Sequence, residues 1–334
     1  MKQYLQVIDS AKSLIDEGER YIIFNDGKAI DTNTGEDVEI TVNEAIDFRD
    51  YLHKTNSKLE NEIEKNSRFK TLISIKKDIN LKIIHICDDE KYLNYQIDVA
   101  KRLNVNLSVV YSHVVNDAKI KLELLVHHKS IVNYREYQAF KENVDIVTSF
   151  YMLRYNQFSY KSFSECESSV NNNVNVYLLQ EQIDFDALNV VINDSSKEQT
   201  SSTNIYHLAN DTKSNLNSYG IANKNSVLRF KNIGNISKGS IHSDLKQKAK
   251  GIILDQYSQI EADPVLIIDE NDVMAGHGAS IGAMNPDDLY YLMSRGLPRT
   301  EAEKLMIKAY ILPFFNDYEE SNLGKFILDN IKID

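Results

Sequence analysis

Cysteine is scarce in this sequence: Cys87 and Cys166 are the only two among 334 residues. Two cysteines cannot form the disulfide framework that stabilises small secreted proteins, and these two match no paired ligand spacing of a metal site. We therefore interpret each of them as a small apolar residue of the protein interior.

Positive charge is also in short supply. The chain has 38 Lys and Arg against 49 Asp and Glu, a formal net charge of −11. Affinity for nucleic acids depends on cations that neutralise phosphates, so we expect no nucleic-acid partner. Lys246, Lys248 and Lys250 form a local run of cations, and such a run is most often a solvated face.

Long apolar runs are missing. The first residues, MKQYLQVIDSAKSLIDEGE, are charged and amphipathic and lack the apolar core of a signal peptide. No segment approaches the roughly 18 apolar residues of a membrane span. We therefore expect a cytoplasmic protein that does not associate with membranes.

Complete catalytic motifs are absent as well. The sequence contains neither a G-x-S-x-G nucleophile elbow nor a phosphate-binding G-x-x-x-x-G-K-[ST] loop. The pair His127-His128 would point to opposite faces of a strand, which suits joint metal binding poorly. The pairs Asp88-Asp89 and Asp287-Asp288 suit a turn and a helix start. We therefore predict a protein that is not an enzyme.

Three regions differ in pattern. In residues 1–77, apolar residues recur at helical spacing between Tyr4 and Ile15, and a strand with the turn Asn25-Asp26-Gly27 follows. A second helix is predicted from an N-cap at Asn43 to about Lys65, with a thin apolar stripe. That stripe consists of Ala45, Ile46, Phe48 and Leu52.

Residues 78–283 contain about a dozen short segments of β-branched and aromatic residues, and no proline precedes Pro264. Many alternate: Val105, Leu107 and Val109 fall on one face of a strand. One helix is predicted at about 90–102. Strands without alternating long helices favour a sandwich, a barrel or a parallel β-helix, and no fixed period chooses among the three.

Residues 284–334 predict a pair of helices. Asn285 can cap a helix that starts at Pro286 and stops at Gly296, with Leu289, Leu292 and Met293 on one face. Thr300 and Glu303 are predicted as the capping box of a second helix, and Pro313 is expected beyond its end.

His277 lies in the small-residue segment AGHGASIG. Glycine and alanine let backbones approach closely and leave an imidazole accessible for metal binding or proton transfer. From this pattern alone, a single histidine is more often a structural residue than a functional one.

A longer stretch, from Glu261 to Tyr310, reads EADPVLIIDENDVMAGHGASIGAMNPDDLYYLMSRGLPRTEAEKLMIKAY. Its ADP-x-L-x-I-D strand, its DV-x-x-x-H-x-A-[ST]-x-G segment and its LYYLMSRG helix resemble the C-terminal part of the SufB/SufD family of iron–sulfur cluster assembly proteins. Residues 207–236 look like the family's penultimate β-helix turns, more weakly. The resemblance implies a mainly β fold, a parallel β-helix core with N-terminal helices and a C-terminal αα subdomain.

The match looks more like SufD than SufB. Members of the SufB type carry a functional cysteine before the P-x-L-x-I segment, and the corresponding KQKAKGIILDQ contains none. The SufD-like subunit contributes a histidine, and His277 occupies that position. The resemblance therefore implies a non-catalytic scaffold with no permanently bound cofactor and a transient iron–sulfur cluster at a subunit interface.

The resemblance also implies partners. The C-terminal helices would bind a SufC-like ABC-type ATPase, the β-helix edge near 250–275 would pair with a SufB-like subunit, and the isolated chain would form a homodimer. The expected ATPase-binding residues are Asp288, Leu289, Tyr290, Tyr291, Met293, Arg295, Gly296 and Lys304.

Two alternatives stay open. A shortened SufD paralogue would serve only as an interaction or iron-entry module, without a role for His277 in cluster assembly. A carbohydrate-active β-helix enzyme would need clustered acidic or basic residues on one strand face, and the sequence contains no clear acidic pair of that kind.

Overall fold

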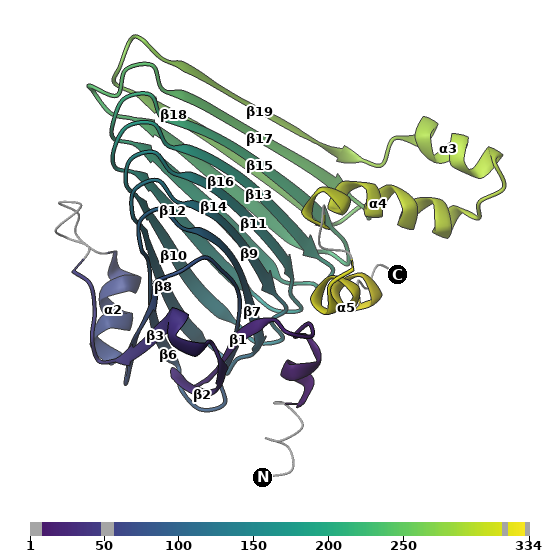
Figure 1. Cartoon of the computed structure of the whole chain (residues 1–334). Helices are drawn as coiled ribbons and strands as arrows, with labels where there is room; N and C mark the ends of the chain where they lie inside the picture. Colours follow the sequence, from purple (N-terminus) through teal and green to yellow (C-terminus); the bar gives the residue numbers. More distant parts are fainter. Residues whose placement is uncertain (1–8, 48–56, 316–319, 331–334) are drawn as a thin grey trace.

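The computed structural model describes residues 9–47, 57–315 and 320–330. Its main feature is a parallel β-solenoid in which the chain passes alternately through two facing sheets (Figure 1). This confirms the β-helix over the sandwich and the barrel. Helices lie outside the solenoid at both ends of the chain.

The first sheet, sheet A, has ten strands in the order β19-β17-β15-β13-β11-β9-β7-β5-β1-β2. In this sheet only the pair β1–β2 is antiparallel. The predicted turn at Asp26-Gly27 joins these two strands, and both turn residues have positive φ. The strands are β1 Arg20–Asn25, β2 Lys28–Asn33, β5 Ile79–Ile86, β7 Asn104–His113, β9 Ile131–Gln138, β11 Gln157–Glu165, β13 Asp184–Asn193, β15 Lys213–Ala222, β17 Asp244–Ile253 and β19 Met274–Ala283.

The second sheet, sheet B, has nine strands in the order β18-β16-β14-β12-β10-β8-β6-β4-β3. It faces sheet A across the lumen of the solenoid. The strands are β3 Val38–Val42, β4 Lys70–Ile75, β6 Tyr92–Val99, β8 Ala118–Val126, β10 Val144–Met152, β12 Val170–Leu178, β14 Glu198–His207, β16 Val227–Ile236 and β18 Gln259–Ile268.

The lumen holds the main hydrophobic core because every second residue of a strand points inward. In β7 the predicted inward set Val105, Leu107 and Val109 is buried. Tyr134 and Phe150 meet across the lumen with ring centroids 5.3 Å apart. Burying each large side chain stabilises the fold by about 2 kcal/mol, so these stacked layers hold the two sheets together.

The helix predicted at 90–102 is wrong: strand β6 occupies this segment. Leu93, Tyr95, Ile97 and Val99 are buried in the lumen at a spacing of two residues. The charged residues at both ends of the segment gave it the composition of a helix, but the pairing of β6 with β4 and β8 fixes it as a strand.

The N-terminal region differs from its prediction in one helix. Asn43 has a positive φ and caps no helix; helix α2 is shorter, Lys58–Asn66, and begins after Ser57, which forms a capping box with Glu60. Of the predicted first helix, residues 9–13 are helical and Ala11 is buried. Tyr4, Leu5, Ile8, Phe48 and Leu52 lie outside the described residues.

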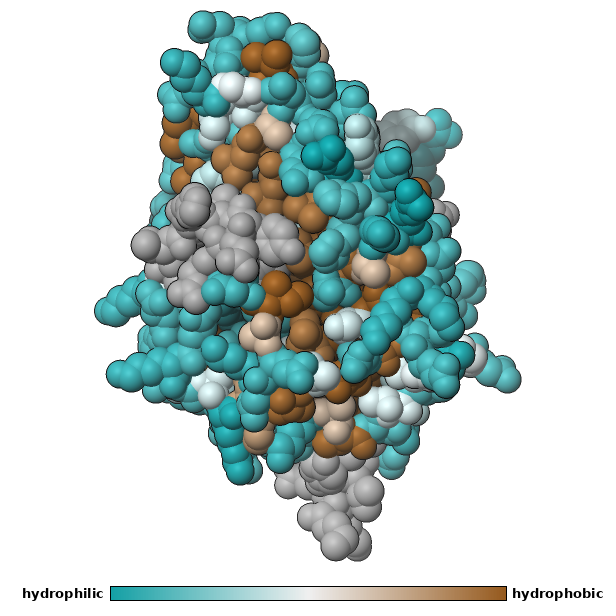
Figure 2. Space-filling view, turned by 60° about the vertical axis from the view of Figure 1, so that its left-hand side comes forward, coloured by the Kyte–Doolittle hydropathy of each residue, from teal (hydrophilic) through white to brown (hydrophobic). Residues whose placement is uncertain are grey.

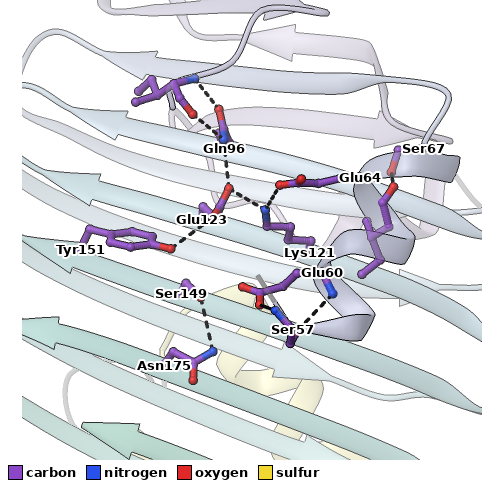
Figure 3. Close-up of polar contacts among 12 residues, drawn as sticks. Ser57, Glu60, Glu64, Ser67, Gln96, Lys121, Glu123, Ser149, Tyr151 and Asn175 are labelled. Carbon is purple, nitrogen blue, oxygen red and sulfur yellow. Dashed lines mark hydrogen bonds and ion pairs between the residues drawn. The ribbon is translucent and has the colours of Figure 1, made fainter. Parts of the chain in front are cut away.

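Helix α2 is attached to the outer face of sheet B through a buried lysine of that sheet (Figure 3). The Lys121 ammonium lies 2.6 Å from a carboxylate oxygen of Glu64 and 3.0 Å from one of Glu123. Glu123 also accepts hydrogen bonds from Gln96 and Tyr151. The opposed charges offset the desolvation of this lysine, so removing one partner would be costly.

A smaller hydrophobic cluster lies on the same side of the molecule. It contains Leu125, Tyr151, Leu153 and Tyr177, and Tyr177 stacks on Tyr206 with ring centroids 5.0 Å apart. Figure 2 shows this side as a hydrophilic surface interrupted by a band of hydrophobic residues.

The C-terminal region contains α3 Pro286–Ser294, α4 Arg299–Phe315 and α5 Asn322–Asn330. The cap at Asn285 and the stop at Gly296 are confirmed. The predicted capping box is wrong, because Thr300 already lies inside α4. The position predicted for Pro313, beyond the end of the helix, is also wrong, because Pro313 lies inside α4. Helices α4 and α5 cover the outer face of sheet A with the buried residues Ile307, Ile311, Phe314, Phe315, Leu323 and Ile327.

Both cysteines are buried, as predicted. Burial raises the pKa of the Cys87 thiol to about 12 and that of the Cys166 thiol to about 11. Thiolates are the reactive and metal-binding form of cysteine, and these two are protonated at neutral pH.

Candidate functional site

The C-terminal end of the solenoid is open. Strands β18 and β19 are the last strands of their sheets, and each has a neighbour on one side only. Every residue of β19 is exposed. The predicted interface at 250–275 therefore needs adjustment, because β17 is an interior strand and the free edge consists of β18 and β19.

Hydrophobic side chains are exposed at this end. Because β18 and β19 continue the alternation of the strands beneath them, their inward-facing residues line an uncovered lumen. Ile281 belongs to this set, and its side chain lies over Gly251 of the turn below. Ile268 also faces the lumen, whereas Val265, Ile267 and Met274 are exposed on the outer faces of the two strands.

His277 lies in the middle of β19, in register with Gln247 of β17. Residues paired in a parallel sheet point to the same side, so the imidazole faces the open lumen above the Gln247 side chain. A Cβ added at Gly276 or Gly278 would meet no atom within 4 Å. His277 is itself exposed, and its neighbours on the same face of the strand are the small residues Ala275 and Ala279, so the imidazole is accessible, as the sequence pattern predicted.

Polar side chains cross the lumen in the turns below Ala279, two residues along the strand from His277. The Asn189 amide donates to the Thr203 hydroxyl at 3.0 Å, and in the next turn the Asn232 amide donates to the Ser218 hydroxyl at 3.2 Å. These bonds connect sheet A with sheet B, and each lies fully inside the protein. A net gain of about 1 kcal/mol is typical of such a buried pair.

Gln247, which lies directly below His277, has no partner. Both its Oε1 and its Nε2 atoms are buried and make no hydrogen bond to the described residues, and the Nε2 atom reaches toward Gly234 across the lumen. An unsatisfied buried amide costs about 1–3 kcal/mol, which makes Gln247 an unusual residue directly below His277. The sequence prediction missed it, although its position between Lys246 and Lys248 places it on the inner face.

The described part of the chain offers few metal ligands here. No group of three or more His, Cys, Asp or Glu residues among these residues could hold a metal ion. A single neutral imidazole can donate one nitrogen ligand, whereas stable iron–sulfur clusters need several thiolates. Further ligands for a cluster at His277 would have to come from another molecule.

The predicted ATPase-binding residues form a second surface. Helix α3 has no buried residue, with Tyr290 74% and Tyr291 56% exposed. The guanidinium of Arg295 lies 5.2 Å from the centre of the Tyr291 ring. These aromatic rings do not cover the end of the solenoid, which leaves them free to bind a partner.

A cavity of about 540 Å³ separates α3 and α4 from the ends of the last strands. Leu289 and Lys304 line it, together with Ile253 and Ile307. Asp288, Met293 and Gly296 are exposed on α3 or directly after it. At about 3.3 Å per residue, the strand between His277 and Ala283 spans roughly 20 Å, so the two candidate surfaces are distinct.

Residues 70–310 match a family described as "SUF system FeS cluster assembly, SufBD core domain". Among curated proteins, an iron–sulfur cluster assembly protein SufD of Bacillus subtilis is 32% identical over 147 residues, 44% of this chain and 34% of the relative. SufD of Escherichia coli is 24% identical over 30% of this chain and 24% of the relative.

A SufBD family protein of Mycobacterium leprae is 28% identical over 41% of this chain and 16% of the relative. In each of these three alignments the chain covers about a third or less of the relative's length. Among the described residues no helix is long and apolar enough to cross a membrane.

Proposed function

The chain belongs to the SufBD family of the SUF iron–sulfur cluster assembly system, and on this basis we propose that it is a SufD-like, non-catalytic scaffold subunit. Its open end pairs with a SufB-like subunit, and its C-terminal helices bind a SufC-like ATPase. The observation that supports this most directly is the open end itself, where β18 and β19 present free strand edges and exposed apolar residues.

Free strand edges support the proposed pairing because their backbone N–H and C=O groups template the addition of another strand. Both β18 and β19 are ten residues long. A second solenoid that meets this end would extend both sheets and cover the lumen-facing side chains of Ile268 and Ile281 at the same time.

Within that pairing, His277 provides one ligand to a nascent cluster, and the SufB-like subunit provides the thiolate that this chain lacks. ATP binding closes two SufC-like subunits, and the motion reaches the paired open ends through α3 and α4. The cluster is cargo that leaves the interface, because one imidazole with one thiolate holds iron and sulfide weakly.

Replacing His277 tests the proposed ligand role. In a complex reconstituted with SufB-like and SufC-like proteins of the same organism, we expect His277→Ala to abolish cluster transfer to an apo-ferredoxin while subunit binding stays intact. His277→Cys should restore part of the activity because a thiolate also binds iron.

His127→Ala, which changes a half-buried histidine directly after β8 and away from the open end, is the matched control. Full cluster assembly with His277→Ala would leave the chain a module for interaction or iron entry only.

The ATPase contact is best tested with surface variants. Truncation at Ala283 would remove α4, whose residues Ile307 and Phe315 are buried on sheet A, and so would damage the fold. We expect Tyr290→Ala with Tyr291→Ala to prevent co-purification of the SufC-like ATPase. Tyr257→Ala, a tyrosine 66% exposed between β17 and β18, should have no effect; equal binding by both variants would refute the contact.

A further inference from the structure

A row of corners connects sheet B to sheet A along the left of Figure 1. Three successive corners each place one residue other than glycine in the left-handed region: Arg102 at φ 64°, Lys129 at φ 62° and Tyr155 at φ 66°. The Arg102 amide donates to the His128 carbonyl at 3.0 Å, and the Lys129 amide donates to the Arg154 carbonyl at 3.2 Å. The corners therefore stack, and their side chains emerge one above another.

These stacked corners gather cations around a pocket of about 340 Å³. Arg154 pairs with Glu181 at 3.5 Å, whereas no anionic partner among the described residues is recorded for Lys101, Arg102 or Lys129. Adjacent cations repel each other. Acidic residues outnumber basic ones in this chain, which has a net charge of −11, yet none of them is paired with these three cations in the described structure. The unneutralised cations point to an external anion. The pocket is lined by Lys101, Arg102, His128, Lys129, Arg154 and Tyr155.

The remaining groups suit a phosphorylated ligand. His128 has a buried Nδ1 atom without a hydrogen-bond partner in the described structure. The Tyr155 ring is exposed at the edge of the pocket, and the Lys129 ammonium lies 5.5 Å from its centre. A flat ring beside several cations can contact an organic group while the cations bind the phosphate.

We propose that this corner pocket binds the phosphate group of a small phosphorylated molecule, with Lys101, Arg102 and Lys129 as the main phosphate ligands. Arg154 and His128 complete the polar wall, and the Tyr155 ring contacts the organic part. The pocket lies among the β6–β11 turns, away from the open end and from α3. It therefore does not depend on the function proposed above.

Calorimetry on the full chain at low ionic strength, with inorganic phosphate, AMP and adenosine as probes, tests this site. We expect phosphate and AMP to bind saturably, adenosine not to bind, and added salt to weaken both anions. Equal affinities for phosphate and AMP would show that the site binds the phosphate group alone. Tighter binding of AMP than of phosphate would indicate a contact of the nucleoside with Tyr155, and either result supports the site. Absence of binding by both anions would overturn the proposal, as would preference for a short poly-glutamate peptide over phosphate.

A matched pair of variants locates the binding. Asparagine tolerates the left-handed conformation, so Arg102→Asn with Lys129→Asn removes two charges without straining the corners. We expect this double variant to bind phosphate at least about tenfold more weakly, equivalent to about 1.4 kcal/mol. Lys224→Asn is the control, because Lys224 also has a positive φ but pairs with Asp194 at 2.6 Å. Equal weakening by the control, at unchanged thermal stability, would contradict the assignment.

Discussion

Single residues inside the lumen show how the solenoid accommodates polarity. Asn189 and Asn232 are each held by a hydroxyl from the opposite sheet, whereas His85 is fully buried between Phe24 and Tyr111. Burial lowers the pKa of His85 to about 3, so it is neutral in the folded protein at physiological pH. Polar groups in the lumen are therefore tolerated when they are neutral or paired.

Glu136 is the residue whose charge should affect stability most visibly. Burial raises the pKa of its carboxyl group from 4.5 to about 7, although a hydrogen bond from the Gln138 amide opposes the shift. Between these two pH values the folded state keeps a proton that the unfolded state has lost, so stability falls as pH rises from about 4.5 to 7. Above pH 7 the loss is complete, at about 3 kcal/mol.

Glu136→Gln should remove this pH dependence. The glutamine keeps an acceptor for the Gln138 amide and cannot ionise. In urea unfolding, we expect the variant to match the parent near pH 4.5 and to exceed its free energy of unfolding by up to about 3 kcal/mol at pH 8. An equal difference at both pH values would mean that packing, and not the carboxylate charge, sets the effect.

The sequence predicted single residues well where the reason is local. The alternation of apolar and polar residues correctly predicted that Val105 and Leu107 face inward. The presence of only two cysteines, at no metal-ligand spacing, correctly predicted that both are buried. His277 was singled out by the small residues beside it, but its proposed role came from a resemblance. The missing hydrogen bonds of Gln247 could not be predicted from the sequence. They depend on which side chains of the opposite sheet lie near Gln247 in the folded protein.

At the scale of elements, the ends of a helix were predicted correctly where the side-chain cap and the backbone preferences of the residues indicate the same position. Asn285, Pro286 and Gly296 marked α3 correctly. In α4 the residues Thr300 and Glu303 imitate a capping box, but burial of Ile307 and Phe315 against sheet A sets the position of the helix, and the chain is helical already at Arg299. Strand β6 was missed because its pairing is non-local.

Two glycines should respond differently to alanine. A Cβ at Gly234 would lie 2.5 Å from Leu245 Cδ1 and 2.8 Å from Gln247 Nε2, whereas one at Gly278 would meet nothing within 4 Å. We expect Gly234→Ala to lower the free energy of unfolding by about 1–3 kcal/mol through overpacking. Gly278→Ala should change it by less than about 0.5 kcal/mol. Urea unfolding of both variants measures this, and equal effects would contradict the close packing around Gly234.

At the scale of the whole molecule, the solenoid escaped prediction from periodicity because its repeat is not constant. Val144 pairs with Val170, 26 residues later, whereas Lys213 pairs with Asp244, 31 residues later. Corners of different length accommodate the difference, and only strand registers keep the stack regular. The β-helix was therefore predicted from the resemblance of a fifty-residue segment and not from a repeat. The open end of the solenoid was identified only from the structure.

An open end of this kind should make the isolated chain associate with itself. Stacked turns protect each other, and the last turn here has no cap among the described residues, so a second copy can cover β18 and β19 in place of a SufB-like subunit. We expect a homodimer by light scattering, with a dissociation constant that Ile281→Asp raises by about 100-fold or more. The physical reason is that an unpaired carboxylate buried in the contact costs several kcal/mol.

The control for this prediction is Ile241→Asp. Ile281 and Ile241 are 37% and 36% exposed, but Ile241 lies in the corner between β16 and β17. Because both residues are partly exposed in the single chain, neither variant should unfold it, and circular dichroism checks this. A dimer that survives Ile281→Asp but not Ile241→Asp would place the contact at the corners. A monomeric parent chain would show that the free edges need the SufB-like partner before they pair.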